Sequence, residues 1–232
     1  MQQEVETVLA RLAGQPVRVH AAGRTDAGVH ALGLGVSVTL SDRWTPDALR
    51  RALNALLPGD CFVLAIREAR SGFHARKSAL ERQYRYRLGT DGEARSPFRR
   101  PFEWARAGAL EPALLDRAAA ALVGEHDFGA FAVKIATKPH TRCELRRARW
   151  TSRPDGTGFD FEVAANRFLH HMVRILVATM VDVAAGRRPA KDVERLLARD
   201  PLVRASAPAP PQGLYFMKVV YPESWFTFPE AA

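Results

Sequence analysis

The octapeptide Gly23-Arg24-Thr25-Asp26-Ala27-Gly28-Val29-His30 joins two segments in which apolar residues alternate. Such alternation predicts strands, and the two glycines allow a tight connection that holds a side chain in one pose. Asp26 lies in this octapeptide and is the only carboxylate between Glu6 and Asp42. A metal-dependent nuclease needs several clustered carboxylates, so a lone Asp near an arginine indicates chemistry with a single ionised carboxylate. On local sequence alone, an Asx-type turn in which Asp26 accepts from nearby amides is the simpler interpretation.

Helix-like and strand-like segments are mixed along the whole chain, which predicts an α+β fold. Thr45-Pro46-Asp47 is the clearest helix start, because Thr caps a helix and Pro is favoured at its first position. A polar connection with Gly and Pro at 91–106 divides an N-terminal half, 1–90, from a C-terminal half, 107–222, whose elements follow a similar order. We expect strands at 17–21, 34–40, 61–65, 80–88, 145–151, 159–163 and 214–220, and helices at 5–12, 45–58, 114–123, 168–185 and 192–199.

The chain is basic, and its positive charge is localised. It has 34 Lys and Arg against 25 Asp and Glu, a net charge of +9. Residues 67–106 hold 11 basic and 5 acidic side chains, and residues 134–153 hold 7 basic and 1 acidic. Localised positive charge favours a polyanionic partner such as nucleic acid. A solvated arginine-rich surface is the alternative.

The sequence offers no disulfide framework, membrane span or cofactor motif. Two cysteines, Cys61 and Cys143, fit a reducing cytosol. The longest apolar stretch, 175–185, is too short to cross a bilayer. His170 and His171 fall in a predicted helix, where adjacent side chains point about 100° apart and rarely share one ion. There is no P-loop or dinucleotide fingerprint, so we expect a cytoplasmic protein that needs neither metal nor cofactor.

The octapeptide resembles the signature loop of TruA-type pseudouridine synthases. Further motifs follow in that family's order: Phe73-His74-Ala75-Arg76, Gln83-Tyr84-Arg85-Tyr86, Asn166-Arg167-Phe168-Leu169, Met172-Val173-Arg174 and Gly213-Leu214-Tyr215-Phe216. The resemblance runs from residue 23 to residue 216, nearly the whole chain. It implies a pseudouridine synthase fold, in which a mixed, mostly antiparallel sheet is flanked by helices and two related α/β halves surround a central cleft. It also implies that a homodimer isomerises uridine to pseudouridine in the anticodon stem-loop of tRNA, at tRNA positions 38–40, without a cofactor.

The resemblance also implies a catalytic pair. Asp26 is expected to be the catalytic carboxylate, and Arg174 is expected to pair with it and keep it ionised. Arg24 is expected to help extrude the target nucleotide. From the residues alone, Arg174 also fits a helix surface from which its side chain extends to solvent.

Five other residues match motifs that the resemblance assigns to substrate binding. Tyr84 is expected to stack on the flipped uracil and Leu214 to wall its pocket. His74, Arg76 and Arg85 belong to the matching motifs and are expected to contact the substrate. An apolar core is the simpler interpretation of Tyr84 and Leu214.

The chain departs from the family pattern at its start. The family opens with a strand carrying a Tyr-Asp-Gly run and a Gly-Trp-Gln run, and neither precedes the helix expected at 5–12. We expect about thirty family residues, roughly one strand and a linker, to be missing, which would leave strand amides unpaired at an exposed edge. A noncatalytic RNA-binding relative is therefore an alternative. A nuclease is a second one, although it would need metal ligands or an acid–base pair that the sequence does not offer.

Overall fold

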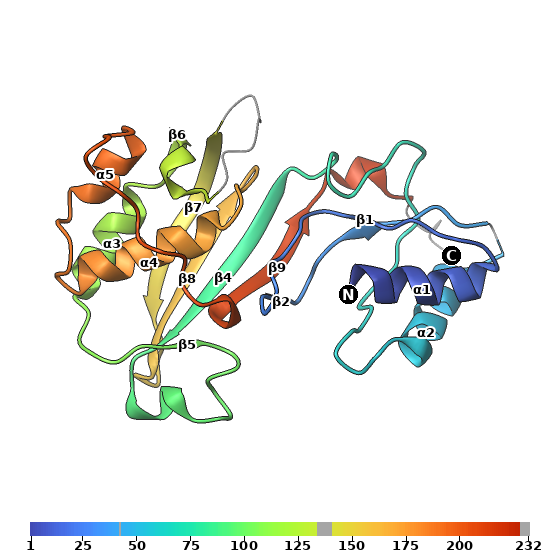
Figure 1. Ribbon diagram of the computed structural model, residues 1–232. Helices are drawn as coiled ribbons and strands as arrows, with labels where there is room; N and C mark the ends of the chain where they lie inside the picture. The colour runs from blue at the N-terminus through green and yellow to red at the C-terminus, as the bar shows by residue number, and fades with distance from the viewer. Residues whose placement is uncertain (42, 134–140, 228–232) are drawn as a thin grey trace. The chain divides into compact units, whose positions relative to one another are not determined.

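The computed structural model describes residues 1–41, 43–133 and 141–227 (Figure 1). The chain forms two compact units, each with its own apolar core. The first unit contains Met1–Arg24, Gly33–Leu80 and the described residues from Val219 onward. The second contains Thr25–Leu32 and Glu81–Lys218. The octapeptide is therefore divided between them, with Asp26 in the second unit.

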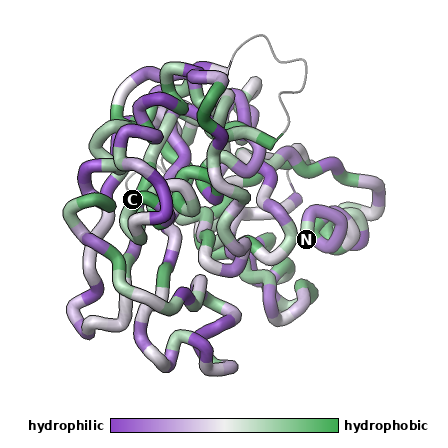
Figure 2. Tube along the Cα trace, turned by 60° about the vertical axis from the view of Figure 1, so that its left-hand side comes forward, coloured by the Kyte–Doolittle hydropathy of each residue, from purple (hydrophilic) through white to green (hydrophobic). Residues whose placement is uncertain are grey.

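The first unit contains two amphipathic helices that begin and end where local signals predict. Helix α1 (Gln2–Ala13) ends because Gly14 adopts a left-handed conformation with φ 73°, from which its amide donates to Ala10 at 2.9 Å. The mixture of polar and apolar residues along α1 can be followed from the N mark in Figure 2. Helix α2 (Pro46–Leu56) begins after Thr45, whose side chain accepts the amide of Ala48 at 3.3 Å.

The core of the first unit lies between these helices and two short strands. Buried Leu9 of α1 packs with Leu49 and Leu53 of α2 and with Val19. Strands β1 (His20–Ala21) and β3 (Val36–Ser37) form an antiparallel pair. The predicted strands at 17–21 and 34–40 are confirmed only for these two-residue pieces.

The strand predicted at 61–65 is wrong. Both backbone groups of Val63 bond instead to the side chain of Asn54, with Val63 N to Oδ1 at 2.7 Å and Nδ2 to Val63 O at 3.0 Å. An amide side chain thus takes the place of a neighbouring strand. Phe62 and Leu64, which supplied the apolar pattern, are exposed.

The second unit is built on one mixed sheet. Its order is β2 (His30–Ala31), β9 (Leu214–Val220), β4 (Glu81–Gly89), β8 (Gly158–Ala165), β7 (Arg142–Ser152) and β6 (Gly124–Asp127), with β5 (Trp104–Ala105) paired to β4. The long pairs β4–β8, β7–β8 and β6–β7 are antiparallel, whereas the short pairs β2–β9 and β4–β5 are parallel. The predicted α+β class with a mixed, mostly antiparallel sheet is confirmed.

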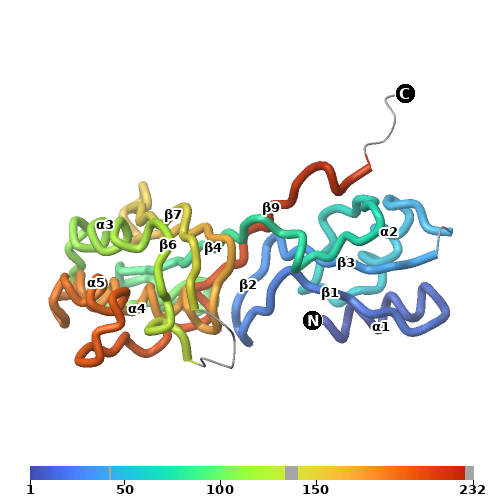
Figure 3. The backbone as a smooth tube through the Cα atoms, turned by 90° about the horizontal axis from the view of Figure 1, so that it is seen from above, coloured from blue at the N-terminus to red at the C-terminus, as the bar shows by residue number. Residues whose placement is uncertain are grey.

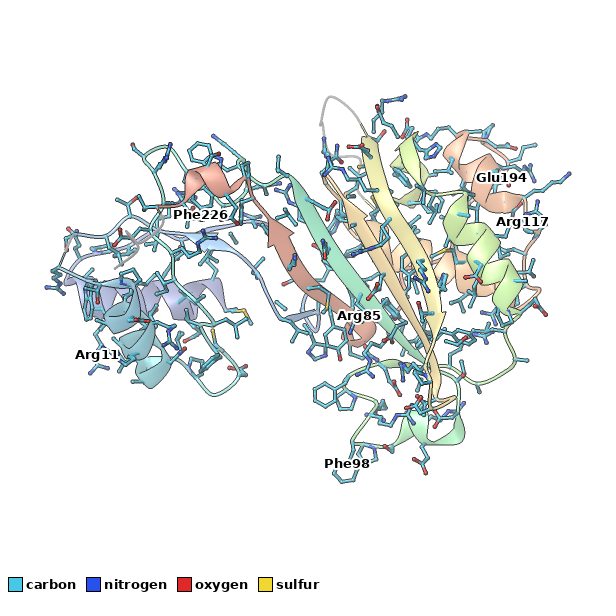
Figure 4. The ribbon with its side chains drawn as sticks, turned by 180° about the vertical axis from the view of Figure 1, so that it is seen from behind. Arg11, Arg85, Phe98, Arg117, Glu194 and Phe226 are labelled. Carbon is cyan, nitrogen blue, oxygen red and sulfur yellow. The ribbon has the colours of Figure 1, made fainter. Side chains whose placement is uncertain are left out.

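The two faces of this sheet differ in chemistry. Side chains alternate along a strand, so Tyr84 and Tyr86 of β4 share one face with Phe161 of β8, which lies opposite Tyr86. That face is apolar and is covered by helices. Arg85 lies on the other face, where it meets Glu162 of β8. Figure 4 shows this second face with Arg85 labelled.

Three helices cover the apolar face: α3 (Pro112–Ala120), α4 (Met172–Ala184) and α5 (Asp192–Leu197). They lie together on one side of the strands in Figures 1 and 3. Apolar α4 is the central element of the core and is buried along most of its length. It begins at Met172 rather than at the predicted Phe168, because His171 has the left-handed angle φ 60° and ends the preceding chain segment.

The connection predicted at 91–106 packs inside the second unit. It contains the 3-10 helix η1 (Gly92–Arg95) and strand β5, which pairs with β4. Its Arg99 and Glu103 form an ion pair at 2.7 Å. Residues 81–90, placed in the N-terminal half by the sequence analysis, also pack with the second unit. That the two halves of the chain are related to each other stays a prediction.

Candidate active site

Asp26 opens a tight turn. The amide of Val29 donates to the carbonyl of Asp26 at 3.1 Å. Gly28, the third residue of the turn, has φ +80°, whereas Ala27 has no positive φ. These angles define a type II turn, which needs glycine at its third position. The glycine of the octapeptide therefore sets the path of the backbone beside Asp26.

The end of the loop is anchored to the sheet. His30 lies opposite Tyr215 in the β2–β9 pair, and the amide of Leu32 donates to Phe216 at 2.9 Å. The imidazole of His30 stacks on Tyr215 with 4.7 Å between ring centroids, and its Nε2 lies 3.0 Å from the carbonyl oxygen of Pro101. These contacts fix the loop on its strand side.

The structure brings together Asp26 and Arg174, the two residues expected to form the catalytic pair. Nη1 of Arg174 donates to Oδ2 of Asp26 at 2.6 Å, and the side chains are 13% and 24% exposed. Arg174 lies in the first turn of α4. Its Nε donates to the carbonyl of Ala209 at 2.7 Å, and its own carbonyl accepts the amide of Ala209 at 3.1 Å. A guanidinium fixed in this way supplies the counter-charge that an ionised carboxylate needs.

The Pro-rich segment 209–211 bonds Arg174 and lies beside Gly28 in the turn that carries Asp26. It binds Arg174 through Ala209, and the carbonyl of Pro210 accepts the hydroxyl of Tyr86 at 2.8 Å. A Cβ placed on Gly28 would come within 3.2 Å of the ring of Pro211. No sequence motif predicted a part for this segment in the site. Proline rigidity was the available signal, but it does not identify the partner.

Two histidines, His170 and His171, lie beside the Asp26–Arg174 pair. The prediction that both belong to a helix is wrong, because α4 begins only after His171, whose φ is 60°. Nε2 of His171 lies 3.2 Å from Oδ2 of Asp26, and Nε2 of His170 lies 3.8 Å from Oδ1. Burial lowers the pKa of His171, and the charge of Asp26 only partly offsets this effect. His171 is therefore neutral near pH 7.

Helix geometry does not keep His170 and His171 from sharing a metal ion, because both precede α4. Ligand atoms of Asp26, His170 and His171 all lie within 4.8 Å of one another. The group contains one carboxylate, however, and Arg174 already donates to it at 2.6 Å. A cation there would face the positive charge of the guanidinium in partly buried surroundings. Chemistry without a metal stays a prediction, now supported by charge rather than by helix geometry.

Tyr84 and Leu214 lie at the border between this group and the core. The ring of Tyr84 makes edge contacts with Phe168 and Phe216, at centroid distances of 5.0 and 4.8 Å. Burial raises the pKa of Tyr84 well above its ordinary value, and the charge of Asp26 adds to this shift. Its hydroxyl therefore stays protonated. Leu214 is buried in the core of the second unit.

Arg85 is not brought to this group. Alternation along β4 puts it on the face opposite to Tyr84, where it pairs with Glu162 at 3.1 Å. Both side chains of this pair are more than a third exposed. A contact between Arg85 and RNA would therefore involve the open face of the sheet and not the surroundings of Asp26.

Arg24, His74 and Arg76 belong to the first unit. The ring of His74 packs against that of His20, with 4.7 Å between centroids, and its Nδ1 accepts the amide of Arg76 at 3.1 Å. The amide of His74 donates to Oγ of Ser78 at 3.1 Å. These contacts give the Phe73-His74-Ala75-Arg76 motif a defined shape within its unit.

Part of the positive charge in the two basic segments is neutralised internally. Arginines paired with carboxylates include Arg67 with Glu223, Arg99 with Asp91 and Glu103, Arg142 with Glu125, and Arg153 with Glu103 and Asp160. Residues 134–140 of the second segment lie outside the described residues. Exposed Arg147 and Arg149 have no carboxylate partner in the part of the chain that the structure describes.

The arrangement can support chemistry at one carboxylate oxygen. Oδ2 of Asp26 accepts a hydrogen bond from the guanidinium of Arg174 and lies near His171. Among the ion pairs of the described residues, Oδ1 has only the contact with His170, at 3.8 Å. An aromatic side chain, Tyr84, lies near enough for its pKa to respond to Asp26. A fixed carboxylate beside an aromatic group suits the handling of a flat, uncharged base.

Comparison with known proteins defines the class. Residues 118–222 match the family described as tRNA pseudouridine synthase. Three proteins named tRNA pseudouridine synthase A are similar over almost the whole chain. The protein from Methylococcus capsulatus is 40% identical, over 97% of this chain and 82% of its own length. Those from Solidesulfovibrio magneticus and Geobacter sulfurreducens are both 41% identical, over 94% of this chain and over 80% and 88% of their own lengths. The chain belongs to the tRNA pseudouridine synthase A family.

In residues 1–41, 43–133 and 141–227, no helix has the length and apolar character that a membrane crossing requires.

Proposed function

We propose that this chain isomerises uridine to pseudouridine in tRNA and that Asp26 is the catalytic carboxylate. The observation that carries the proposal is the 2.6 Å pair between Asp26 and Arg174, formed on a glycine-dependent turn. Membership of the tRNA pseudouridine synthase A family supports the reaction and the substrate class.

The reaction fits a site of this composition. The bond from C1′ of the ribose to N1 of uracil breaks, the base turns, and C1′ bonds to C5. C5 loses a proton and N1 gains one, so nothing is oxidised and no group is imported. An ionised Asp26 can act as a nucleophile or as a base beside the ribose. Attack on the sugar, attack on the base and a glycal route all remain compatible with the site.

The target nucleotide has to leave its stack before it can react. Extraction costs a few kcal/mol, which aromatic contacts and phosphate contacts offset. We assign the aromatic contact to Tyr84, one wall of the pocket to Leu214, and help in extrusion to Arg24. The protonated hydroxyl of Tyr84 can donate a hydrogen bond but cannot accept a proton at neutral pH.

The finer substrate and the assembly are proposals that rest on the resemblance to TruA-type enzymes. We propose the anticodon stem-loop, at tRNA positions 38–40, as the substrate, a homodimer as the active form and the cytoplasm as its location. His74, Arg76 and Arg85 are proposed to contact tRNA. Because Arg85 lies on the sheet face opposite Tyr84, its contact would be with the backbone of the RNA away from the target base.

The test is incubation of the protein with unmodified tRNA, followed by chemical derivatisation that maps pseudouridine at single-nucleotide resolution. We expect product with EDTA present and no product from Asp26→Asn. A tRNA with cytidine at positions 38–40 serves as the substrate control and is expected to stay unmodified. Binding of tRNA without any product from the wild-type chain would favour the noncatalytic alternative and contradict the proposal.

A further inference from the structure

His171 is a second, unassigned neighbour of the Asp26 carboxylate. It is one of two non-glycine residues with positive φ in the described part of the chain. This conformation is uncommon outside glycine and persists only where its surroundings hold it. Here it ends the extended segment before α4 and brings the imidazole to 3.2 Å from Oδ2 of Asp26.

The surroundings of the ring select one protonation state. Nδ1 of His171 is buried and has no hydrogen-bond partner among the described residues. A protonated Nδ1 would be a buried donor without an acceptor, which costs more than an unprotonated ring nitrogen in the same place. The neutral ring with its proton on Nε2 satisfies both ends, because Nε2–H can then donate to Asp26. Burial lowers the pKa of His171 in the same direction.

The two oxygens of Asp26 are consequently unequal. Oδ2 receives Nη1 of Arg174 at 2.6 Å and faces Nε2 of His171 at 3.2 Å. Oδ1 has His170 at 3.8 Å, which is beyond hydrogen-bond distance, and His170 is half exposed. The hydrogen bond from Arg174 and the nearby imidazole of His171 both face Oδ2, whereas Oδ1 accepts no hydrogen bond from the described residues.

We propose that His171 is a positioning residue: with Arg174 it holds Oδ2 of Asp26, so that Oδ1 is the oxygen that reacts with the substrate. The proposal rests on the assignment of Asp26 as the catalytic carboxylate. It does not make His171 a catalytic residue, because His171 acts through Asp26.

Two substitutions separate the Nε2 donor from the mere presence of a polar side chain. In His171→Gln the amide nitrogen reaches about as far as Nε2 of the imidazole, whereas in His171→Asn it reaches only as far as Nδ1. Asn tolerates the left-handed backbone well. We expect His171→Asn to lower the single-turnover rate about ten- to a hundredfold, the usual range for losing a hydrogen bond to a charged group. His171→Gln is expected to restore most of that rate.

Each variant is measured for single-turnover rate with excess enzyme, for tRNA Kd and for thermal unfolding. A positioning role predicts a changed rate with Kd and Tm nearly unchanged. A wild-type rate in His171→Asn would overturn the proposal. Equal rate losses in the Asn and Gln variants, with equal drops in Tm, would also overturn it, because they would show a structural role alone.

A spectroscopic measurement tests the protonation state without any change to His171. Protein labelled with ¹⁵N in histidine is expected to show His171 as the neutral tautomer with the proton on Nε2, assigned with His171→Asn as the blank. A proton on Nδ1, or a charged ring at pH 7, would contradict the proposal. Asp26→Asn is assayed in parallel. Turnover by that variant would sink the proposed function, whereas its inactivity beside a fully active His171→Asn would sink only this inference.

Discussion

Glu103 and Asp26 are both carboxylates of the second unit that arginines hold, and they differ in how their two oxygens are used. Glu103 is 3% exposed, and both its oxygens are taken: Arg99 donates to Oε1 at 2.9 Å and Arg153 to Oε2 at 2.7 Å. The side chain of Asp26 is 24% exposed, and its donors gather on Oδ2. A pairing with arginine is common to both sites. Asp26 differs from Glu103 in that its Oδ1 accepts no hydrogen bond from the described residues and is partly exposed.

Glu103 and its partners Arg99 and Arg153 attach the connection at 91–106 to the sheet. Arg99 also bonds Asp91 at 2.6 Å, and Arg153 also bonds Asp160 of β8 at 3.2 Å. Every charge in this network has a partner, which is the condition under which buried ions are tolerated. The network therefore explains how a polar, Gly- and Pro-containing segment becomes an ordered part of the second unit.

The largest expected effect on activity comes from a substitution at Asp26. Asp26→Asn keeps the size of the side chain but removes the charge that a nucleophile or base needs. We expect single-turnover activity to fall at least a thousandfold, while tRNA binding and Tm stay close to those of the wild type. Mass spectrometry checks that the Asn has not deamidated to Asp. Substantial product from the intact variant would remove Asp26 from the mechanism.

The matched substitution in the other group is expected to do the reverse. Glu103→Gln leaves Arg153 buried with one fewer counter-charge, so we expect the free energy of unfolding to drop by about 3 kcal/mol. The folded fraction should keep its single-turnover rate. Denaturant unfolding and rate measurements on the same preparation check both expectations. If Glu103→Gln loses activity without losing stability, the distinction between the two groups is wrong.

A smaller loss is expected from Arg174→Met, which removes the counter-charge but leaves the carboxylate. We expect the rate to fall about a hundredfold, because the carboxylate loses the charged hydrogen bond that fixes and neutralises it. Combined with Asp26→Asn, it should cost little more than Asp26→Asn alone. Additive losses in the double variant would show that Arg174 acts on the substrate and not through Asp26.

The sequence predicted some features of the fold and of the candidate site and missed others. The octapeptide and the helix motif around Arg174 indicated the catalytic pair, because both match a known family pattern. The capped start of α2 and the glycine that ends α1 were also predictable, since each depends on neighbouring residues. The contact between Arg174 and Ala209 was not, because it joins residues 35 positions apart through a backbone carbonyl that no side-chain type announces.

His171 shows why the rest of the site was missed. The apolar spacing of Leu169, Met172 and Val173 continues a helical pattern through the histidine, so periodicity placed the helix start at Phe168. No Gly or Pro marks the left-handed residue at which the helix begins. The strand predicted at 61–65 failed for a related reason. Its backbone partner is the Asn54 side chain, and a hydrophobic pattern carries no information about that.

Tyr84→Phe should have a modest effect. The ring and its contacts with Phe168 and Phe216 remain, so base stacking is retained. Because the hydroxyl is protonated over the working pH range, its loss removes only a hydrogen-bond donor. We expect the rate to fall by about tenfold or less, with the shape of the pH–rate profile unchanged. Tyr84→Leu, which loses the ring, should be clearly slower. A lost alkaline limb in Tyr84→Phe would mean that the hydroxyl titrates during catalysis.

The smallest expected effect is on tRNA affinity and concerns exposed arginines, which also differ in whether a carboxylate pairs with them. Arg142 is paired with Glu125 at 2.8 Å, whereas Arg149 has no carboxylate partner among the described residues. Arg85, paired with Glu162 on the same sheet face as Arg149, lies between these cases.

Each phosphate contact adds about one to the slope of log affinity against log salt. Arg149→Gln should therefore lower that slope by about one and weaken tRNA binding a few-fold, with turnover of bound tRNA unchanged. Arg85→Gln should do less, and Arg142→Gln, the control, least of all. Filter binding across a salt series measures all three. An equal effect of all three substitutions would show that internal pairing does not decide which arginines meet the RNA.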